Sequence, residues 1–388
     1  MTAIAPFSTT RLPRIVFGEG AIDALSTEAR AFGTRALVVT GRRSLRDLPV
    51  WRSLNEALEI ETVVVADEPS PDLVDAAVAK FHGSGIDVVI GLGGGSALDA
   101  AKAIAGLMVT GNSVMDHIEG VGRGIAYDGP SLPFIAAPST AGTGTEATKN
   151  AVLSSRGPAG FKKSFRDDQL VAQVAIVDPE LLQTCPQALI SANGMDAFTQ
   201  LLEGYVSPKA SAMTDALAWS GLEAFARGFF AAWEEAGRQS ARASAGRADI
   251  AYASLMSGIT LAQTGLGSVH ALASPLGAFF PAPHGVVCGT LLAVATEINI
   301  RALKERDPEN IALAKYARVG RLLSGTDDGL VATLADWTER TGIAKLGEFG
   351  MTAEEVGKVV AASNPGGMKS NPLILSSEEV TELVERRL

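Results

Sequence analysis

The chain has 388 residues, of which 47% are hydrophobic, 20% are charged and 41 are glycine. This composition is ordinary for a globular α/β enzyme and excludes a disordered or fibrous chain, while the length allows two domains. The net charge of −10 argues against a nucleic-acid partner, since phosphate backbones attract basic surfaces.

The cysteines and the N-terminus indicate the compartment. Cys185 and Cys288 stand far apart and fit no cysteine pattern of a zinc site, so we expect reduced thiols. Residues 1–18 contain neither a basic leader nor an apolar run of signal-peptide length. Because no uncharged apolar stretch reaches about 18 residues, we expect no membrane partner and a cytoplasmic location.

The first half of the chain alternates predicted strands with predicted helices. Short, mostly β-branched runs bounded by Gly, Pro or Asp predict buried strands at 35–40, 62–66, 87–91, 133–137 and 174–178. Helical patterns lie before or between them at 21–32, 73–82 and 96–105. This alternation predicts a Rossmann-like α/β domain over residues 1–185, with a parallel sheet covered on both faces.

The second half of the chain lacks strand patterns. From residue 187 the pattern is helical, with predicted segments at 191–206, 210–235 and 248–265 and others up to the C-terminus. Glycine and proline mainly separate these segments. The Ala- and Arg-rich stretch 237–247 is expected to be an exposed helix or a loop. We therefore expect an all-α domain over residues 186–388.

A glycine-rich loop joins the third predicted strand to the following helix. Residues 91–96 read Gly-Leu-Gly-Gly-Gly-Ser, and Ser96 stands where the third glycine of a G-x-G-x-x-G fingerprint would fall. Glycines allow close approach of a diphosphate, and the N-terminus of a helix attracts anions. A second loop rich in hydroxyl groups and glycine, 138–146, follows the fourth strand. Both loops indicate a nucleotide site at the carboxyl ends of the strands.

Two of the four histidines are candidate metal ligands. His82 and His117 are expected at a helix end and in a loop, without a catalytic role. His270 lies in a helical stretch and His284 follows a proline. Imidazole and carboxylate are ligands of Zn(II) and Fe(II), and Asp196 lies upstream. Spacing alone favours the metal site and the packed-histidine interpretation equally.

Taken together, these motifs resemble those of the iron-containing (group III) alcohol dehydrogenases. Four segments carry the resemblance, in order over nearly the whole chain: 93–102 (GGGSALDAAK), 138–146 (PSTAGTGTE), 194–198 (GMDAF) and His270-(x13)-His284-Gly285. The resemblance implies a dehydroquinate-synthase-like architecture, with an N-terminal NAD(P)-binding domain and a helical C-terminal domain. It also implies metal-assisted hydride transfer between NAD(P) and a small alcohol or aldehyde, by a homodimer or larger assembly.

The resemblance also implies site residues. The expected cofactor contacts are Gly94, Gly95, Ser96, Asp99, Thr140 and Thr143, and Lys162 is an expected catalytic residue. The family's metal is held by an Asp, a His four residues later and two further His, so Asp196, His270 and His284 match three of these ligands.

Two family imidazoles are absent from this chain. Gln200 stands four residues after Asp196, and Ser274 stands four residues after His270, where the family often has another His beside the substrate. We expect Asp196, His270 and His284 to bind Fe(II) or Zn(II), with Gln200 as a weaker fourth ligand and reduced metal affinity. Ser274 is a candidate proton relay.

The loop after the first predicted strand bears on the choice of cofactor. It reads Gly41-Arg42-Arg43, and an acidic residue at this place would bind the ribose 2′-hydroxyl of NAD and repel a 2′-phosphate. Glycine removes that repulsion and either arginine can pair with a phosphate, so the sequence favours NADP over NAD.

Two other functions remain open from the sequence. A dehydroquinate-synthase-like cyclase would also use NAD and a metal, but it needs basic residues for a phosphorylated substrate, and the helical half offers few near the motifs. Alternatively, the missing imidazoles mark a catalytically decayed nucleotide-binding protein. Phosphate release would identify the first, and nucleotide binding without turnover the second.

Overall fold

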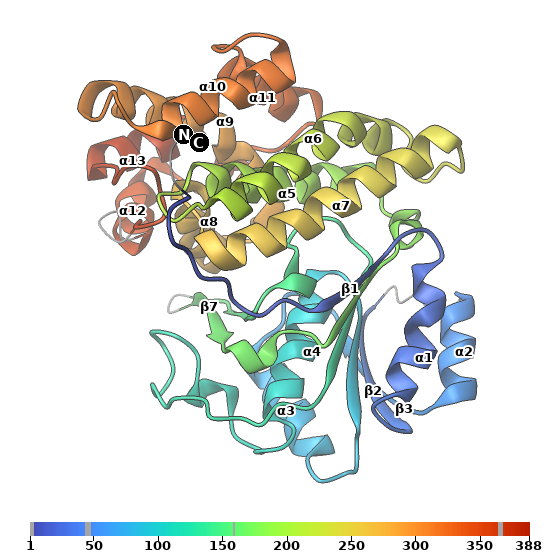
Figure 1. Cartoon of the computed structure of the whole chain (residues 1–388). Coiled ribbons are helices and arrows are strands. Elements are labelled where there is room, and N and C mark those ends of the chain that lie inside the picture. Colours follow the sequence, from blue (N-terminus) through green and yellow to red (C-terminus); the bar gives the residue numbers. More distant parts are fainter. Residues whose placement is uncertain (1–3, 43–47, 158–159, 364–367) are drawn as a thin grey trace. The chain divides into compact units, whose positions relative to one another are not determined.

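The structure, a computed structural model, describes residues 4–42, 48–157, 160–363 and 368–388. The chain folds into two compact units. One unit comprises Thr10–Thr184, and the other comprises Cys185–Leu388 together with residues 4–9. The first unit is built around a parallel sheet and the second is built of helices (Figure 1).

A six-stranded parallel sheet forms the centre of the Thr10–Thr184 unit. Its strands lie in the order β1-β8-β5-β4-β2-β3. They are β1 (Arg14–Phe17), β2 (Arg35–Gly41), β3 (Glu59–Val65), β4 (Val88–Gly93), β5 (Phe134–Pro138) and β8 (Val174–Val177). The predicted parallel sheet and its five strands are confirmed. The edge strand β1 was not predicted. It has only four residues, which is shorter than the apolar runs that indicated the other five strands.

Helices cover both faces of this sheet, each over its own apolar core (Figure 1). The helices are α1 (Leu25–Arg30), α2 (Pro49–Ala57), α3 (Pro71–Phe81) and α4 (Gly95–Leu107). Val38 and Ile90 face the core under α1 and α2. Their neighbours Leu37 and Val89 face the core under α3 and α4. Since successive strand residues point to opposite faces, the central strands are buried on both sides.

A two-stranded antiparallel hairpin, β6 (Asn150–Ser155) and β7 (Phe161–Arg166), lies outside the main sheet. The sequence did not predict it, because β7 carries three charged residues in six and shows no buried apolar run. Helix α2 was missed as well.

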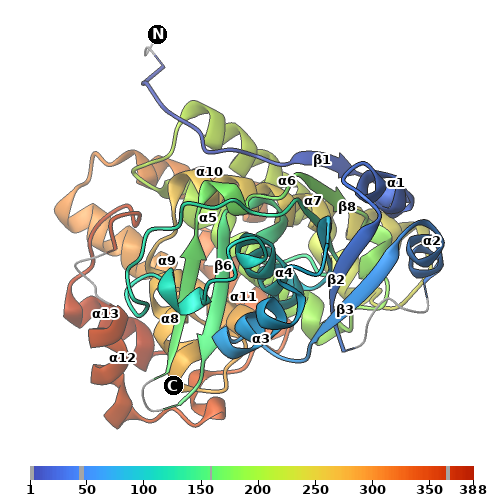
Figure 2. The same ribbon diagram turned by 90° about the horizontal axis from the view of Figure 1, so that it is seen from below.

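The second unit contains only helices among its described residues, as predicted. They include α5 (Gln187–Val206), α6 (Ala212–Glu234), α7 (Ala241–Thr264), α8 (Ser268–Phe279), α9 (His284–Arg306), α10 (Ile311–Ser324), α11 (Leu330–Arg340), α12 (Val356–Ser363) and α13 (Ser377–Glu385). Helix α7 begins within the stretch 237–247, for which a helix or a loop was expected. Helix α9 packs against both α5 and α8 (Figure 2).

Helix α9 is apolar along most of its length. Among the described residues it is the one helix long and apolar enough to cross a membrane by length and composition, yet 78% of its apolar window is buried inside the protein. Val287, Leu291 and Ile298 place it in a hydrophobic core that it shares with α8. Such burial is typical of the core helix of a globular domain.

Candidate active site

The predicted glycine loop follows β4 at the point where the strand order reverses. The chain runs from β2 to the edge strand β3 and then returns to β4 on the other side of β2. Thr40 pairs with Leu92 across these two parallel strands. Gly41 and Gly93 therefore end neighbouring strands. Ligands of open α/β sheets bind at such a switch point, outside the carboxyl ends of the strands.

Two threonine hydroxyls lie against the glycine loop. A side chain on Gly95 would come within 2.8 Å of Thr143 Oγ1, so only glycine fits there. A side chain on Gly94 would come within 3.4 Å of Thr140 Oγ1. Helix α4 begins at Gly95, so the N–H groups of its first turn, including that of Ser96, lack helical partners and favour an anion. The structure thus brings together these five predicted nucleotide contacts.

Lys102 on α4 holds the loop 138–146, here called the threonine loop, by hydrogen bonds to this loop and to the residues that follow it. Its fully buried ammonium donates hydrogen bonds of 2.7–2.8 Å to the main-chain oxygens of Thr145, Thr148 and Asn150. Asp99, also buried, accepts a hydrogen bond of 3.3 Å from the Thr145 hydroxyl. Burial raises the pKa of Asp99 and lowers the pKa of Lys102. The predicted cofactor residue Asp99 is therefore part of the scaffold under the loop.

The end of β2 leaves open space among the described residues. A side chain on Gly41 would meet none of their atoms within 4 Å, and its backbone is not in the left-handed region, so neither their packing nor the conformation requires glycine there. The side chain of Arg42 is 69% exposed, and its Nη2 lies 3.9 Å from Asp67 Oδ2. Arg43, the other predicted phosphate ligand, lies outside the described residues. An open position next to an exposed guanidinium suits a phosphate group.

Lys162 lies on β7 and is held by Glu68. Its Nζ is 2.6 Å from Glu68 Oε1, and the Ser154 hydroxyl donates to the other carboxylate oxygen at 2.6 Å. Burial would raise the pKa of Glu68, but Lys162 and Ser154 outweigh it and lower the pKa. Because Glu68 follows β3, Lys162 is fixed beside a carboxyl end of the parallel sheet, in the unit that carries the glycine loop.

Asp196, His270 and His284 converge from three helices of the second unit. Asp196 lies in the middle of α5, His270 in the first turn of α8, and His284 is the first residue of α9. His270 Nε2 is 3.2 Å and His284 Nε2 is 3.7 Å from Asp196 Oδ1. The two rings meet edge to face, with centroids 5.5 Å apart. The three residues that spacing alone left undecided form one cluster.

Cys288 completes this cluster, although the sequence patterns did not reveal it. It lies one turn after His284 on α9, with its Sγ 3.7 Å from His270 Nε2 and 3.8 Å from His284 Nε2. One ligand atom from each of the four residues lies within 4.8 Å of the others. Zinc patterns built on cysteine pairs exclude Cys288, whereas the i, i+4 pair of His284 and Cys288 places two ligands on one helix face.

Two glycines allow the first turns of α9 to approach α5. A side chain on Gly285 would come within 2.3 Å of the Ala192 carbonyl oxygen, and one on Gly289 within 3.0 Å of Met195 Cβ. The clash with the backbone oxygen at Gly285 cannot be relieved by moving a side chain, and the contact at Gly289 would be tighter than usual. The glycine that follows His284 in the sequence motif therefore brings this end of α9 against the helix that carries Asp196.

Gln200 turns its amide oxygen away from the cluster. Its Nε2 donates a hydrogen bond of 3.1 Å to Asp196 Oδ1, while its Oε1 accepts one of 2.7 Å from the Ser257 hydroxyl. The opposite amide orientation would set two acceptor oxygens against each other. In this arrangement Gln200 orients the Asp196 carboxylate and presents no oxygen to the two imidazoles.

Known proteins similar to this chain match it over nearly its whole length. The family model described as iron-containing alcohol dehydrogenase matches residues 13–179, and the C-terminal model of the Fe-containing alcohol dehydrogenase family matches residues 190–388. The probable alcohol dehydrogenase EutG of Escherichia coli is 30% identical over 382 residues, covering 96% of this chain and 92% of that protein. The chain belongs to the iron-containing alcohol dehydrogenase family. The predicted resemblance is confirmed.

Solved structures agree with this assignment. A 1,3-propanediol oxidoreductase superimposes with a TM-score of 0.86 at 26% identity, covering 99% of this chain and 100% of the other. A sulfoacetaldehyde reductase from Bifidobacterium kashiwanohense, solved in complex with NAD+, has a TM-score of 0.85 at 26% identity and 99% coverage of both chains. The predictions of the architecture and of an alcohol dehydrogenase-type oxidoreductase are confirmed, and the match decides against the cyclase alternative.

Glu203 orients His270 in this dehydrogenase, and it too was missed from the sequence. Its carboxylate accepts hydrogen bonds from His270 Nδ1 at 2.8 Å and from the main-chain N–H groups of Gly267 and Val269 at 2.8 and 2.7 Å. It therefore caps α8 and leaves His270 Nε2 directed at Asp196. The missed pattern was the i, i+7 spacing of Asp196 and Glu203 on one face of α5.

The surroundings of the cluster favour the charged forms of Asp196 and His270 and the uncharged form of the Cys288 thiol. Burial would raise the pKa of Asp196, but the adjacent His284 and His270 lower it to about 2. Burial would lower the pKa of His270, but contacts with Cys288 and two carboxylates raise it well above its usual value. Burial raises the pKa of Cys288 to about 12. The carboxylates therefore favour positive charge at this place, which is what a divalent cation supplies.

Most separations between the ligand atoms of the four cluster side chains are close to those around a tetrahedral cation. Zinc lies about 2.0–2.1 Å from histidine nitrogen and about 2.3 Å from cysteine sulfur, so ideal tetrahedral edges are about 3.3 Å between nitrogen and oxygen and about 3.6 Å between nitrogen and sulfur. The observed separations are 3.2 and 3.7 Å between the imidazole nitrogens and Asp196 Oδ1. They are 3.7 and 3.8 Å between the same nitrogens and Cys288 Sγ. Four of the six separations are therefore close to tetrahedral edges, and across the remaining two the ligand atoms lie within 4.8 Å of each other.

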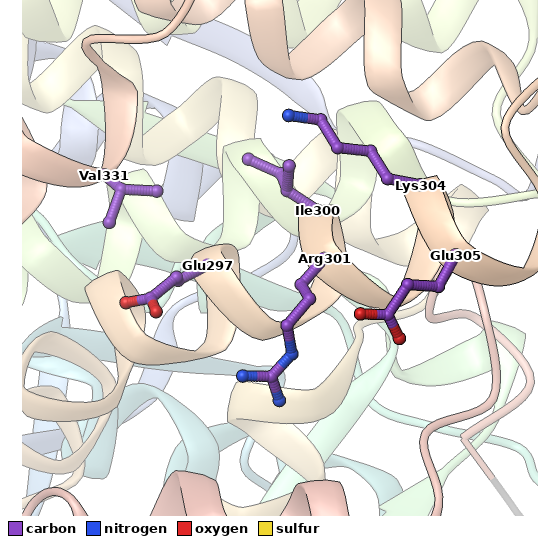
Figure 3. A pocket seen from close by; sticks show the side chains of 6 residues that line it. All are labelled: Glu297, Ile300, Arg301, Lys304, Glu305 and Val331. Atoms are coloured by element: carbon purple, nitrogen blue, oxygen red, sulfur yellow. The ribbon is translucent and has the colours of Figure 1, made fainter.

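The remaining histidines and a surface pocket lie outside the cluster. His82 ends α3 and contacts the Met108 carbonyl oxygen, and His117 stacks on Phe165, so neither joins the site, as expected. Figure 3 shows a pocket of about 360 Å³ lined by Glu297, Ile300, Arg301, Lys304, Glu305 and Val331. Glu297 lies about 13 Å beyond Cys288 along α9, so this pocket is separate from the ligand cluster.

Proposed function

We propose that this enzyme transfers a hydride between a nicotinamide dinucleotide and a small alcohol or aldehyde, assisted by a divalent cation held by Asp196, His270 and His284. The observation that carries the proposal is the convergence of a buried carboxylate and two imidazoles on one point. Family membership supports the reaction, and the NAD+ complex of the sulfoacetaldehyde reductase supports the cofactor class.

The glycine loop is the proposed nucleotide site. The N–H groups at the start of α4 and the hydroxyls of Thr140 and Thr143 bind the diphosphate, because they form a polar cradle at the switch point of the sheet. Lys102 and Asp99 hold the threonine loop in place from beneath. Lys162, held by Glu68 at 2.6 Å, supplies a further basic side chain at the carboxyl edge.

NADP is the proposed form of the cofactor. The open space at Gly41 accepts the additional phosphate, and the exposed guanidinium of Arg42 pairs with it. Asp67 is the only acidic group paired with Arg42 among the described residues, and its exchange for a phosphate leaves the arginine with a stronger partner.

The cluster residues divide the chemistry between them. A bound divalent cation supplies Lewis-acid polarisation of the substrate oxygen. Asp196 supplies the negative charge that holds the cation, and Glu203 keeps the Nδ1 proton of His270 so that Nε2 faces the cluster. Ser274 lies one turn after His270 on the same face of α8, and we assign to its hydroxyl the transfer of the substrate proton towards solvent.

The proposal also covers the substrate class, the cellular compartment and the oligomeric state of the enzyme. Small uncharged alcohols and aldehydes are the expected substrates. Both cysteines are buried and neither forms a disulfide, which fits a reducing cytoplasm. We also propose a homodimer or larger assembly, in line with the family resemblance.

Replacement of Asp196 tests the proposal. Asp196→Ala should lose its bound metal and reduce NADPH turnover with simple aldehydes about a thousand-fold, because several kcal/mol of transition-state stabilisation disappear. Metal content is measured by elemental analysis in parallel with turnover. Asp336→Ala, which changes an exposed aspartate on α11, serves as the matched control. Full activity in Asp196→Ala would refute the metal mechanism, and nucleotide binding without turnover in the wild type would indicate a decayed enzyme.

A further inference from the structure

We propose that Cys288 is the fourth protein ligand of the metal in this enzyme, in the place that an α5 imidazole has in the family pattern. The resulting set of one carboxylate, two imidazoles and one thiolate selects zinc over iron. This inference rests on the proposed function and specifies the metal site within it.

The position of the sulfur is the first argument. Cys288 Sγ is nearly equidistant from the two imidazole nitrogens, at 3.7 and 3.8 Å, and these separations are close to the edges of a tetrahedron around zinc. The side chain is fully buried in the cluster. Gln200, by contrast, has its oxygen engaged by Ser257 and its nitrogen directed at Asp196, and a nitrogen that carries two protons is no ligand.

The arrangement of the helices is the second argument. In the family pattern the chelating i, i+4 pair lies on α5, as Asp and His. Here that pair is Asp196 and Gln200, and a new i, i+4 pair of His284 and Cys288 stands on α9. The close packing of α9 on α5 at Gly285 brings the new pair to the same carboxylate. One ligand has thus been lost from one helix and another gained on its neighbour.

The chemistry of sulfur is the third argument. When a divalent cation binds, the Cys288 thiol loses its proton to solvent and a metal–sulfur bond forms, so each metal ion bound releases that proton. One thiolate and one carboxylate then balance the two charges of the cation while both imidazoles bind as neutral bases. Thiolate is a soft ligand, and a tetrahedral set that contains it suits Zn(II) better than Fe(II).

Cobalt substitution tests the proposal on the full-length enzyme. Cobalt(II) bound to the wild type should show a sulfur-to-metal charge-transfer band in the near ultraviolet, together with the intense visible bands of a tetrahedral site. Cys288→Ser and Cys288→Ala should lose the charge-transfer band. Cys185→Ser changes the other buried thiol and should keep it, and Gln200→Ala should keep it as well. Circular dichroism verifies that each variant is folded.

Metal affinity provides a second readout. Loss of an outer-shell partner typically costs about 10–100-fold in affinity, so loss of a direct ligand in Cys288→Ser should weaken zinc binding at least about 100-fold. Wild-type enzyme loaded with equal zinc and ferrous iron under anaerobic conditions should retain zinc, and Cys288→Ser should reduce that preference.

The outcomes separate the two proposals. Cobalt that binds to the wild type without a sulfur band, or a band that persists in Cys288→Ser, overturns the role of Cys288 and leaves the Asp196 site intact. Wild-type enzyme that binds no cobalt at all overturns both this inference and the metal-assisted function.

Discussion

The proposed nucleotide site and the proposed metal cluster lie in different units and are built from different parts of the chain. The nucleotide site consists mainly of backbone: strand ends, the glycines at 93–95 and the first turn of α4. The metal cluster consists of side chains from α5, α8 and α9. A backbone site therefore depends on the absence of side chains, and a cluster depends on which side chains are present.

This difference determines how each site tolerates change. The position of a backbone N–H is fixed by the fold, so the nucleotide site cannot exchange one donor for another. A ligand atom in the cluster needs only to arrive at the correct point, from whichever helix. The chain illustrates this, because Gln200 has no oxygen in the cluster while Cys288, from another helix, has its sulfur there.

Gly95→Val is the strongest test of the backbone site. The new side chain would collide with Thr143, whose hydroxyl would lie 2.8 Å from the added Cβ, and would close the cradle. Loss of about three charge-assisted hydrogen bonds, at roughly 1.5 kcal/mol each, should weaken NADPH binding roughly a thousand-fold or more. Fluorescence titration of NADPH measures the effect. Gly357→Val, where an added side chain meets open space, should bind NADPH normally. A loss of metal from Gly95→Val would contradict the independence of the two sites.

Lys102→Met tests whether one buried side chain stabilises the threonine loop of the proposed nucleotide site. The change leaves the carbonyl oxygens of Thr145, Thr148 and Asn150 without their donor and should destabilise the enzyme by about 3 kcal/mol or more. Chemical denaturation measures the free energy of unfolding. Lys304→Met, at an exposed lysine, should change it little. If Lys102→Met unfolds with the same free energy as the wild type, the hydrogen bonds of Lys102 do not stabilise the threonine loop.

The two sites also differ in how far the sequence predicted them. The run Gly93-Gly94-Gly95 and the buried strands before it predicted the nucleotide site, because backbone requirements appear locally as glycines between a strand and a helix. The hydroxyls of Thr140 and Thr143 followed from the neighbouring strand in the same way. The hairpin β6–β7 was missed, because its stability comes from contacts such as Ser154 with Glu68 that no local pattern records.

In the cluster, the sequence predicted only the residues that the family resemblance supplied. Asp196, His270 and His284 matched the family's ligands, whereas Cys288 and Glu203 had no counterpart in the expected pattern. Their roles depend on how three helices pack, which the sequence determines through distributed contacts such as those at Gly285. Helical spacing from a predicted ligand was the one local clue to both residues.

Glu203→Gln tests whether the cluster depends on its supporting hydrogen bonds. One carboxylate oxygen accepts from Val269 N–H and the other from Gly267 N–H and His270 Nδ1, so an amide nitrogen at either position would face a donor. Metal affinity should fall about 10–100-fold, the usual cost of losing such a partner. Competition with a chelator measures it, and Glu354→Gln at an exposed site is the control. Unchanged affinity would assign Glu203 to the capping of α8 alone.

Arg42→Ala makes the smallest change, at the one place where the nucleotide site uses an exposed side chain. Loss of a charge-assisted contact with the 2′-phosphate, worth about 1.5 kcal/mol, should raise the KM for NADPH roughly tenfold and leave the KM for NADH unchanged. Asp67→Asn removes the carboxylate that lies 3.9 Å from this arginine and should lower the KM for NADPH. Steady-state kinetics with both cofactors provides the comparison, and Arg52→Ala, at another exposed arginine, is the control. Equal effects of Arg42→Ala on both cofactors would mean that the guanidinium stabilises the end of β2 rather than recognising a phosphate, and the nucleotide site would then be built of backbone throughout.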